Sequence, residues 1–318
     1  MKNYIFSISI VLAVVISMIF PHYFIEIGGF PLKKLIIPLL QVIMFGMGAT
    51  MHFQDFKNVL LMPKAVFVGL VCQFTIMPFL GYGLAMSFNF PPEIAAGIIL
   101  VGCSPSGLSS NVMSYIAKAN VPLSITITSF ATLLAPILTP FLMKTLGGQF
   151  IDIQFWSMVF DILKMVILPI IVGLIVHQLA GRYMVQLEKI LPIVSMVGIA
   201  VIIVIITASG RDALLSIGLS LIVVVILHNG LGYLLGYWGG RLFGLPEQDC
   251  RTIAIEVGLQ NAGLASGLAL QLGKVATVGL APALFGPIMN VSGSLLATSW
   301  GKKVPKLKLS DFQKHRII

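Results

Sequence analysis

The stretch Arg251–Gln271, RTIAIEVGLQNAGLASGLALQ, decides the fold of this chain. It begins as an apolar helix and then places Glu256 beside the amides of Gln260 and Asn261, with a glycine on either side of them. A charged side chain at the centre of a membrane helix costs roughly 2.5–3.5 kcal/mol on insertion scales, so we expect a bound cation to compensate Glu256. Glycines and amides together are typical of a helix that opens to show its backbone. The combination is typical of the midplane site of a secondary transporter.

The rest of the chain places this stretch in a membrane. The 318 residues are 58% hydrophobic and 10% charged, with a mean hydropathy of +1.01, whereas soluble domains carry about 25% charged residues. A span needs roughly 20 apolar residues, so there is room for roughly nine to eleven spans. The alternation of polar and apolar residues that marks a membrane barrel is absent, and we therefore expect an all-α polytopic membrane protein.

Charge and cysteine content exclude several other classes. The net charge of +9 comes from residues at expected helix ends and in the C-terminal tail, so we expect no nucleic-acid partner. Cys72, Cys103 and Cys250 have no CxxC spacing and are interpreted as small buried residues, neither disulfides nor metal ligands. Residues 1–20 imitate a signal peptide but lack a small-x-small cleavage site, and they are interpreted as part of an uncleaved first helix.

Ten helices are expected, and the fourth and ninth are interrupted. The interruptions fall at Cys103–Gly107 and near Val257–Gly263. The expected helices cover residues 4–27, 34–51, 65–88, 92–117, 121–147, 155–180, 190–208, 213–241, 248–271 and 274–300.

The distribution of basic residues predicts the orientation. With a cytoplasmic N-terminus, 14 of the 20 Lys and Arg residues lie on the cytoplasmic side and 5 on the other, with Lys164 inside the sixth helix. Cytoplasmic loops carry the excess of Lys and Arg. We therefore expect a multi-pass protein of the cell membrane (the inner membrane in a Gram-negative cell) with both termini in the cytoplasm.

An internal repeat is indicated by three short matches in the same order. Their offsets are 155, 156 and 162 residues, which corresponds to five helices. An odd number of spans inverts the second copy, and interrupted helices at matching places in inverted halves point to a binding site. The matching segments are Leu80–Tyr82 with Leu235–Tyr237, Gly107–Ser110 with Gly263–Ser266, and Thr132–Ala135 with Ser294–Ala297.

The interrupted helices can bind ions of both signs. An interruption frees carbonyls that suit a cation and N–H groups that suit an anion. Hard oxygen ligands with one carboxylate suit Na⁺ better than a transition metal or Ca²⁺. Ser110, Asn111, Ser124, Thr128 and Glu256 supply such oxygens. A second cluster combines Gln73 and Gln260 with the carbonyls of Val257 and Leu259.

Several motifs resemble the bile acid:sodium symporter family, over roughly residues 43–301. They are Gly102–Met113 (GCSPSGLSSNVM), Leu227–Gly230 (LHNG), Glu256–Leu264 (EVGLQNAGL) and Ser292–Ala297 (SGSLLA). The resemblance implies ten helices in two inverted five-helix repeats, with discontinuous helices 4 and 9 crossing at their breaks. It also implies a core domain (residues 65–150 and 211–301) that moves against a panel domain (residues 1–64 and 151–210), followed by a cytoplasmic tail (residues 302–318).

The same resemblance implies the ligands. One Na⁺ site would comprise Ser110, Asn111, Ser124, Thr128 and Glu256, and a second would comprise Gln73, Glu256, Val257, Leu259 and Gln260. The substrate would bind near Leu108, Ser109, Asn261 and Asn290. Two residues depart from the family: Leu108 stands where close bacterial members often have Thr, and Met289 where they often have His. Both lie nearer the expected substrate site than the ion sites. They therefore bear on which substrate is carried and do not affect the predicted coupling to Na⁺.

We therefore expect a Na⁺-coupled symporter of an organic anion, such as a bile acid or a smaller carboxylate, that works by alternating access with two Na⁺ ions. The main alternative is a proton-coupled organic anion transporter or antiporter in which Glu256 carries the proton. Glu256 as a purely structural acid and a channel are weaker alternatives. His228 is interpreted as a buried side chain bonded to a neighbouring helix. We expect no enzyme, since no HExxH or GxSxG motif occurs, and we expect a monomer.

Overall fold

The protein is a bundle of long apolar helices. The computed structural model describes residues 12–52, 59–180 and 184–302. Six of the described helical segments are long and apolar enough to cross a membrane, and Pro92–Cys103 and Ile193–Ser209 are shorter apolar helices. The chain is therefore a multi-pass membrane protein. The six segments are Leu32–Ala49, Pro63–Ser87, Val121–Gly147, Phe155–Leu179, Arg211–Leu242 and Leu280–Lys302.

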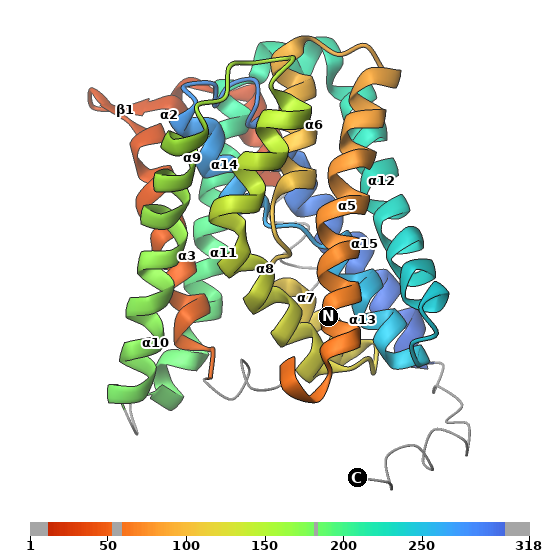
Figure 1. Cartoon of the computed structure of the whole chain (residues 1–318). Helices are drawn as coiled ribbons and strands as arrows, with labels where there is room; N and C mark the ends of the chain where they lie inside the picture. The colour runs from red at the N-terminus through yellow and green to blue at the C-terminus, as the bar shows by residue number, and fades with distance from the viewer. Residues whose placement is uncertain (1–11, 53–58, 181–183, 303–318) are drawn as a thin grey trace, which may run out of the picture.

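The elements follow one another with short connections (Figure 1). Residues 12–19 are helical and precede the first labelled element. In chain order the elements are α2 (His22–Ile25), β1 (Glu26–Ile27), β2 (Phe30–Pro31), the 3₁₀ helix η1 (Leu32–Leu35), α3 (Ile36–Ala49), α5 (Pro63–Ser87), α6 (Pro92–Cys103), α7 (Ser109–Ile116), α8 (Val121–Leu142), the π-helix η2 (Met143–Gly147), α9 (Phe155–Ile162), the π-helix η3 (Leu163–Ile167), α10 (Leu168–Ala180), α11 (Met184–Ser209), α12 (Arg211–Leu242), α13 (Glu247–Gly258), α14 (Ala262–Gln271) and α15 (Leu280–Lys302).

Local sequence explains where several helices begin. Proline occupies the first turn of α5, α6 and α8, where its missing N–H costs nothing and its fixed φ suits a helix. The side chain of Asn120 caps α8 by accepting a hydrogen bond from the Leu123 N–H at 3.1 Å. These signals place the start of α8, which carries two of the expected ion ligands.

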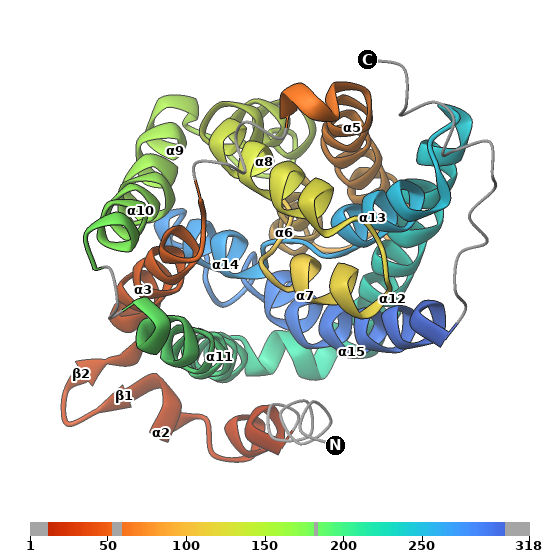
Figure 2. The ribbon, with the colours of Figure 1, turned by 90° about the horizontal axis from the view of Figure 1, so that it is seen from below.

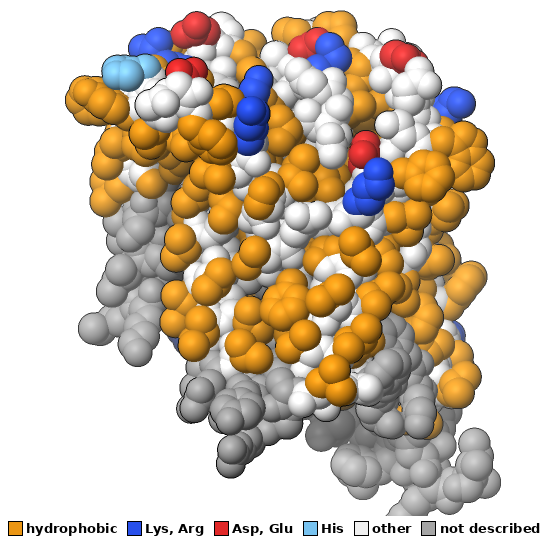
Figure 3. Space-filling view, turned by 90° about the vertical axis from the view of Figure 1, so that its left-hand side faces the viewer, with side chains coloured by type: hydrophobic (Ala, Val, Ile, Leu, Met, Phe, Trp, Pro, Cys, Tyr) orange, Lys and Arg blue, Asp and Glu red, His pale blue; other side chains and the backbone are white. Residues whose placement is uncertain are grey.

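The outer surface is suited to lipid. Figure 3 shows one face on which hydrophobic side chains cover most of the middle, while Lys, Arg, Asp and Glu side chains gather mainly near its upper edge. Viewed from below, α6, α7, α13 and α14 lie in the inner part of the bundle, with α3, α5, α8, α11, α12 and α15 around them (Figure 2). α6 and α13 are mostly buried, whereas α7 exposes Val112 and Tyr115.

The beginning of the chain differs from the expected helix 4–27. Its residues 1–11 lie outside the described residues, and so does the tail from residue 303. Glu26–Ile27 pairs antiparallel with Phe30–Pro31, so the expectation that the first helix continues to residue 27 is wrong. Gly28 and Gly29 form its turn with φ of +57° and +82°, and two successive positive φ values suit the right-handed twist of a hairpin.

The last helix also begins later than expected. α15 starts at Leu280, whereas the pattern predicts a helix from residue 274. Lys274 instead forms an ion pair with Glu93, and the Thr277 hydroxyl donates to the same carboxylate at 2.5 Å. These polar contacts to α6 hold residues 274–277 in turns.

Candidate functional site

Two helix interruptions pair with each other inside the bundle. α6 ends at Cys103 and α7 begins at Ser109; α13 ends at Gly258 and α14 begins at Ala262. Residues 106 and 260 form an isolated antiparallel bridge. The Gly107 N–H donates to the Leu259 carbonyl and the Asn261 N–H donates to the Pro105 carbonyl, both at 2.8 Å. Backbone groups released by each interruption are thus satisfied by the other, as an apolar surrounding requires.

A buried carboxylate lies beside this crossing. Glu256 is on the last turn of α13 and its side chain is 0% exposed. The Ser124 hydroxyl donates to Oε1 at 2.5 Å and the Thr128 hydroxyl donates to Oε2 at 2.7 Å. Both hydroxyls come from one face of α8, because residues four apart lie on the same side of a helix. Two helices therefore meet at one negative group.

The α7 helix completes the cluster around Glu256. The Ser110 Oγ lies 3.2 Å from the Thr128 Oγ1. The Ser124 Oγ lies 2.9 Å from the Asn111 Oδ1 and donates there or to Glu256. All five residues predicted for the first ion site thus belong to one hydrogen-bond network.

The residues around Glu256 fit a sodium ion. Among the described residues Glu256 forms no ion pair, since the four salt bridges join other groups. Its neighbours are hydroxyl and amide oxygens, which are hard ligands that suit Na⁺. Within the described part of the chain no group of three or more His, Cys, Asp or Glu residues is arranged to hold a metal ion. A buried carboxylate without a protein cation is strongly destabilised, and a monovalent cation would remove that penalty.

The second predicted cluster is also assembled. The Gln73 amide donates to Gln260 Oε1 at 2.9 Å and to the Ser104 carbonyl at 3.0 Å. The Gln260 amide donates to the Val257 carbonyl at 2.6 Å. The Leu259 carbonyl accepts from the N–H of residue 107, as described above. Within the described residues no hydrogen bond joins the Glu256 carboxylate to either glutamine, so Glu256 meets this cluster through its backbone neighbour Val257.

The predicted substrate residues lie around the same crossing. Leu108 is the N-cap of α7 and offers no side-chain cap, and Ser109 begins the helix. Asn261 is the N-cap of α14, and its Oδ1 accepts from the Leu264 N–H at 2.9 Å. Asn290 donates to the Gly286 carbonyl at 2.8 Å.

Asn290 faces the second interruption from α15. It shares a helix face with Gly286 and Gly293, since these lie four residues before and three after it. An added Cβ would lie 3.6 Å from Ala262 at position 286 and 3.2 Å from Leu259 at position 293. No hydrogen bond joins Asn290 to Ser109 or Asn261 within the described residues.

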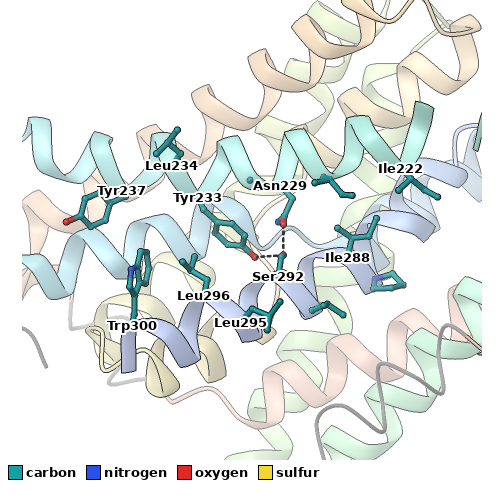
Figure 4. A pocket seen from close by; sticks show the side chains of 14 residues that line it. Ile222, Asn229, Tyr233, Leu234, Tyr237, Ile288, Ser292, Leu295, Leu296 and Trp300 are labelled. Carbon is teal, nitrogen blue, oxygen red and sulfur yellow. Dashed lines mark hydrogen bonds between the residues drawn. The ribbon is translucent and has the colours of Figure 1, made fainter. Parts of the chain in front are cut away.

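A polar network that the sequence did not predict supports the α13 interruption. The Asn229 amide donates to the Gly258 carbonyl at 2.8 Å, and Asn229 Oδ1 accepts from the Ser292 hydroxyl at 2.5 Å. Tyr233 lies next to Ser292, with 3.3 Å between their oxygens (Figure 4). The LHNG motif contains Asn229, but nothing in the sequence shows that its side chain reaches a carbonyl released by the break. The neighbouring His228 bonds the Met77 carbonyl at 2.9 Å, which confirms its structural interpretation.

An apolar groove lies away from this crossing. It has a volume of about 770 Å³ and runs between α12 and α15 (Figure 4). Its walls are mainly apolar, and none of the four predicted substrate residues lines it. The sequence therefore pointed to the helix crossing and gave no sign of this groove.

Known proteins are similar to this chain in sequence. The model of the sodium bile acid symporter family matches residues 37–217. The uncharacterized sodium-dependent transporter YocS of Bacillus subtilis is 41% identical over 95% of this chain and 92% of its own length. The chain belongs to the sodium bile acid symporter family. The chain is also similar to the probable sodium/metabolite cotransporter BASS1 of Arabidopsis thaliana, a chloroplastic protein that is 33% identical over 84% of this chain and 67% of its own length.

Membership in the family settles the class of the protein. It is a sodium-dependent membrane transporter and not an enzyme, as its sequence indicates. Na⁺ is accordingly its coupling ion.

Proposed function

We propose that the protein is a Na⁺-coupled symporter that carries an organic anion, a bile acid or a smaller carboxylate, by alternating access. The observation that carries this proposal is the Glu256 carboxylate, fully buried, free of any described ion pair and surrounded by oxygens at the crossing of two helix interruptions. A proton carried by Glu256 is the alternative, and the sodium-dependent names of the relatives favour Na⁺.

Two sodium ions would bind on either side of the last turn of α13. The first would use Ser110, Asn111, Ser124, Thr128 and Glu256, which already form one network. The second would use Gln73, Glu256, Val257, Leu259 and Gln260. The carbonyls of Val257 and Leu259 accept hydrogen bonds, but each carbonyl oxygen has a second lone pair that can face a cation.

The anion would bind where α7 begins. Leu108 supplies no side-chain cap, and of the first N–H groups of α7 that of Ser110 bonds the Gly107 carbonyl at 3.0 Å. The other N–H groups at this end would bind a carboxylate, because a helix N-terminus favours negative charge. Ser109, Asn261 and Asn290 would supply the polar contacts. Cation and anion would then bind close together, and each would stabilise the other. Coupling follows directly from this attraction.

We further propose the ten-helix architecture with two inverted repeats. Its support is the shared order of α5, α6/α7, α8 and of α12, α13/α14, α15, in which a continuous, an interrupted and a continuous helix follow one another. Residues 65–150 and 211–301 would form the moving core, and residues 1–64 and 151–210 the panel. Both termini, including the tail 302–318, would be cytoplasmic. A groove of about 540 Å³ is lined by Lys33, Glu93 and Lys274. This is expected if these three residues lie at the non-cytoplasmic end of the helix bundle. The proposed unit is a monomer.

The test is the substitution Glu256→Gln, which keeps the shape and removes the charge. The purified full-length protein should lose its stabilisation by NaCl, measured as the shift in melting temperature at constant ionic strength with choline chloride as the balance, because only binding to the folded state raises stability. Reconstituted vesicles of this variant should lose Na⁺-stimulated anion uptake.

Asp249→Asn is the matched control. Asp249 is also a buried carboxylate on α13, but it accepts a hydrogen bond from Asn120 at 2.8 Å, away from the crossing. This variant should keep the Na⁺ response. Full Na⁺ dependence in Glu256→Gln would refute the proposal. A thermal-shift screen of organic anions with and without Na⁺ would identify the substrate class.

A further inference from the structure

Ser106 occupies a central position in the helix crossing. It is the bridge partner of Gln260. The flanking bonds run from the N–H of 107 to the carbonyl of 259 and from the N–H of 261 to the carbonyl of 105. This pattern makes 106 and 260 a non-hydrogen-bonded antiparallel pair, in which the two side chains lie close together on one face. The Ser106 side chain is therefore a neighbour of the Gln260 side chain.

The Ser106 hydroxyl is buried without a hydrogen bond of regular geometry. Its residue is 0% exposed, and within the described residues its Oγ has no partner at regular hydrogen-bond distance and angle. The Glu256 carboxylate lies beside it and interacts with it, as it does with Ser110, Ser124 and Thr128. Unpaired buried hydroxyls are destabilising and rare in folded proteins. An oxygen that lies beside the Glu256 carboxylate and next to the Gln260 side chain, without a regular hydrogen bond of its own, is placed to coordinate a cation.

We propose that Ser106 is an additional oxygen ligand of the second Na⁺ site and links it to the first. The inference rests on the proposed function, because it assigns a residue to the same ion site. Ser106 stands in the α6/α7 interruption, whereas Gln260, Val257 and Leu259 belong to the α13/α14 interruption. An ion bound to both would hold the two interruptions together. Na⁺ occupancy would thereby be sensed by both broken helices.

Two other described hydroxyls provide a comparison. Ser114 on α7 and Thr207 on α11 are likewise buried and without a hydrogen-bond partner in the described parts of the chain. Neither is among the groups that interact with the Glu256 carboxylate. Ser114 therefore shares the residue type, the burial and the missing partner of Ser106, and differs in its place relative to the site. Ser114→Ala is the matched control for Ser106→Ala.

The experiment uses Na⁺ alone, so no substrate is needed. The purified full-length protein and the variants Ser106→Ala and Ser114→Ala are titrated with NaCl against choline chloride, and the melting temperature is followed. Without Na⁺, both variants should be as stable as the parent or more stable, since each removes an unpaired hydroxyl. The NaCl concentration at half-maximal shift should rise about three- to tenfold in Ser106→Ala, the effect of losing one neutral ligand. It should be unchanged in Ser114→Ala.

A second variant protects the test against a folding defect. Ser106→Cys keeps the size of the side chain but presents a soft sulfur, which is a poor ligand for Na⁺. It should shift the titration in the same direction. A Na⁺ titration of both Ser106 variants that matches the parent would overturn the inference. If Glu256→Gln has meanwhile abolished the response, only the assignment of Ser106 fails; if Glu256→Gln still responds to Na⁺, the proposed function fails as well.

Discussion

The two helix interruptions pair with each other but are built differently. The α6/α7 interruption, residues 104–108, contains Pro105, which favours extended backbone at Ser104, where ψ is 153°. It is followed by a helix whose N-cap, Leu108, has no side-chain hydrogen bond. The α13/α14 interruption, residues 259–261, contains no proline, and Asn261 caps the following helix. The α14 N-terminus therefore has a side-chain cap, whereas the α7 N-terminus has none.

The two interruptions also differ in the charge of the groups that they carry. The α13/α14 side carries the carboxylate of Glu256 and the carbonyls of Val257 and Leu259, all of which suit a cation. The α6/α7 side and its continuation carry neutral hydroxyls and an amide, with Ser110 and Asn111 reaching the Glu256 cluster through α8. In the function proposed above, the α13/α14 interruption would supply the negative groups for Na⁺, and the α6/α7 interruption would supply neutral oxygen ligands for Na⁺ and the N–H groups for the anion.

The largest effect is expected where the breaks are tightest. At Gly258 an added Cβ would lie 2.2 Å from the Tyr233 ring, and at Gly107 it would lie 2.8 Å from the Gln260 carbonyl oxygen. Alanine at either position should destabilise the protein by about 2–3 kcal/mol, as overpacking does, and reduce the Na⁺ response. Gly230→Ala on α12 is the control, because its Cβ would meet nothing within 4 Å. Thermal unfolding with and without NaCl measures both the stability and the Na⁺ response. A Gly258→Ala variant as stable as the parent would show that the packing there is loose.

A smaller effect separates the two ion clusters. Gln73→Ala removes the amide that holds Gln260 and the Ser104 carbonyl, so about 1 kcal/mol of ion binding should be lost. This corresponds to about a fivefold higher NaCl midpoint in the thermal titration. Thr75→Ala, on the exposed side of the same helix, is the control, since its hydroxyl bonds only the Val71 carbonyl. An unchanged NaCl titration in Gln73→Ala would reject a second site there.

The smallest effect tests the difference in capping. Asn261→Ala should destabilise α14 by about 1 kcal/mol, as the loss of an N-cap does. Leu108→Asn should stabilise α7 by up to about 1 kcal/mol through a new cap. It should also weaken anion binding, because the new side chain competes for the same N–H groups. The measurements are the melting temperature and the concentration dependence of anion uptake. Stronger anion binding by Leu108→Asn would show that the α7 N-terminus is not the anion site.

Much of the candidate site could be predicted because its parts are local. Ser110 with Asn111, Ser124 with Thr128, and Val257 through Gln260 are close in sequence, and helix geometry alone brings each group to one place. A resemblance to a known family then connected the groups. Ser106 and Asn229 were missed, because each gains its role from a residue far along the chain: Ser106 from Gln260, and Asn229 from Gly258.

The sequence by itself determined that this chain is a helical membrane protein with a costly carboxylate in an interrupted helix. Apolar length and the energetic cost of Glu256 are properties of single segments, and no partner is needed to recognise them. Only the tertiary structure decided which groups surround that carboxylate, which hydroxyl is left without a partner, and where the first and last described helices give way to a hairpin and to turns. Those outcomes depend on hydrogen bonds between distant segments, such as Glu93 with Thr277, and such bonds exist only once the helices have packed.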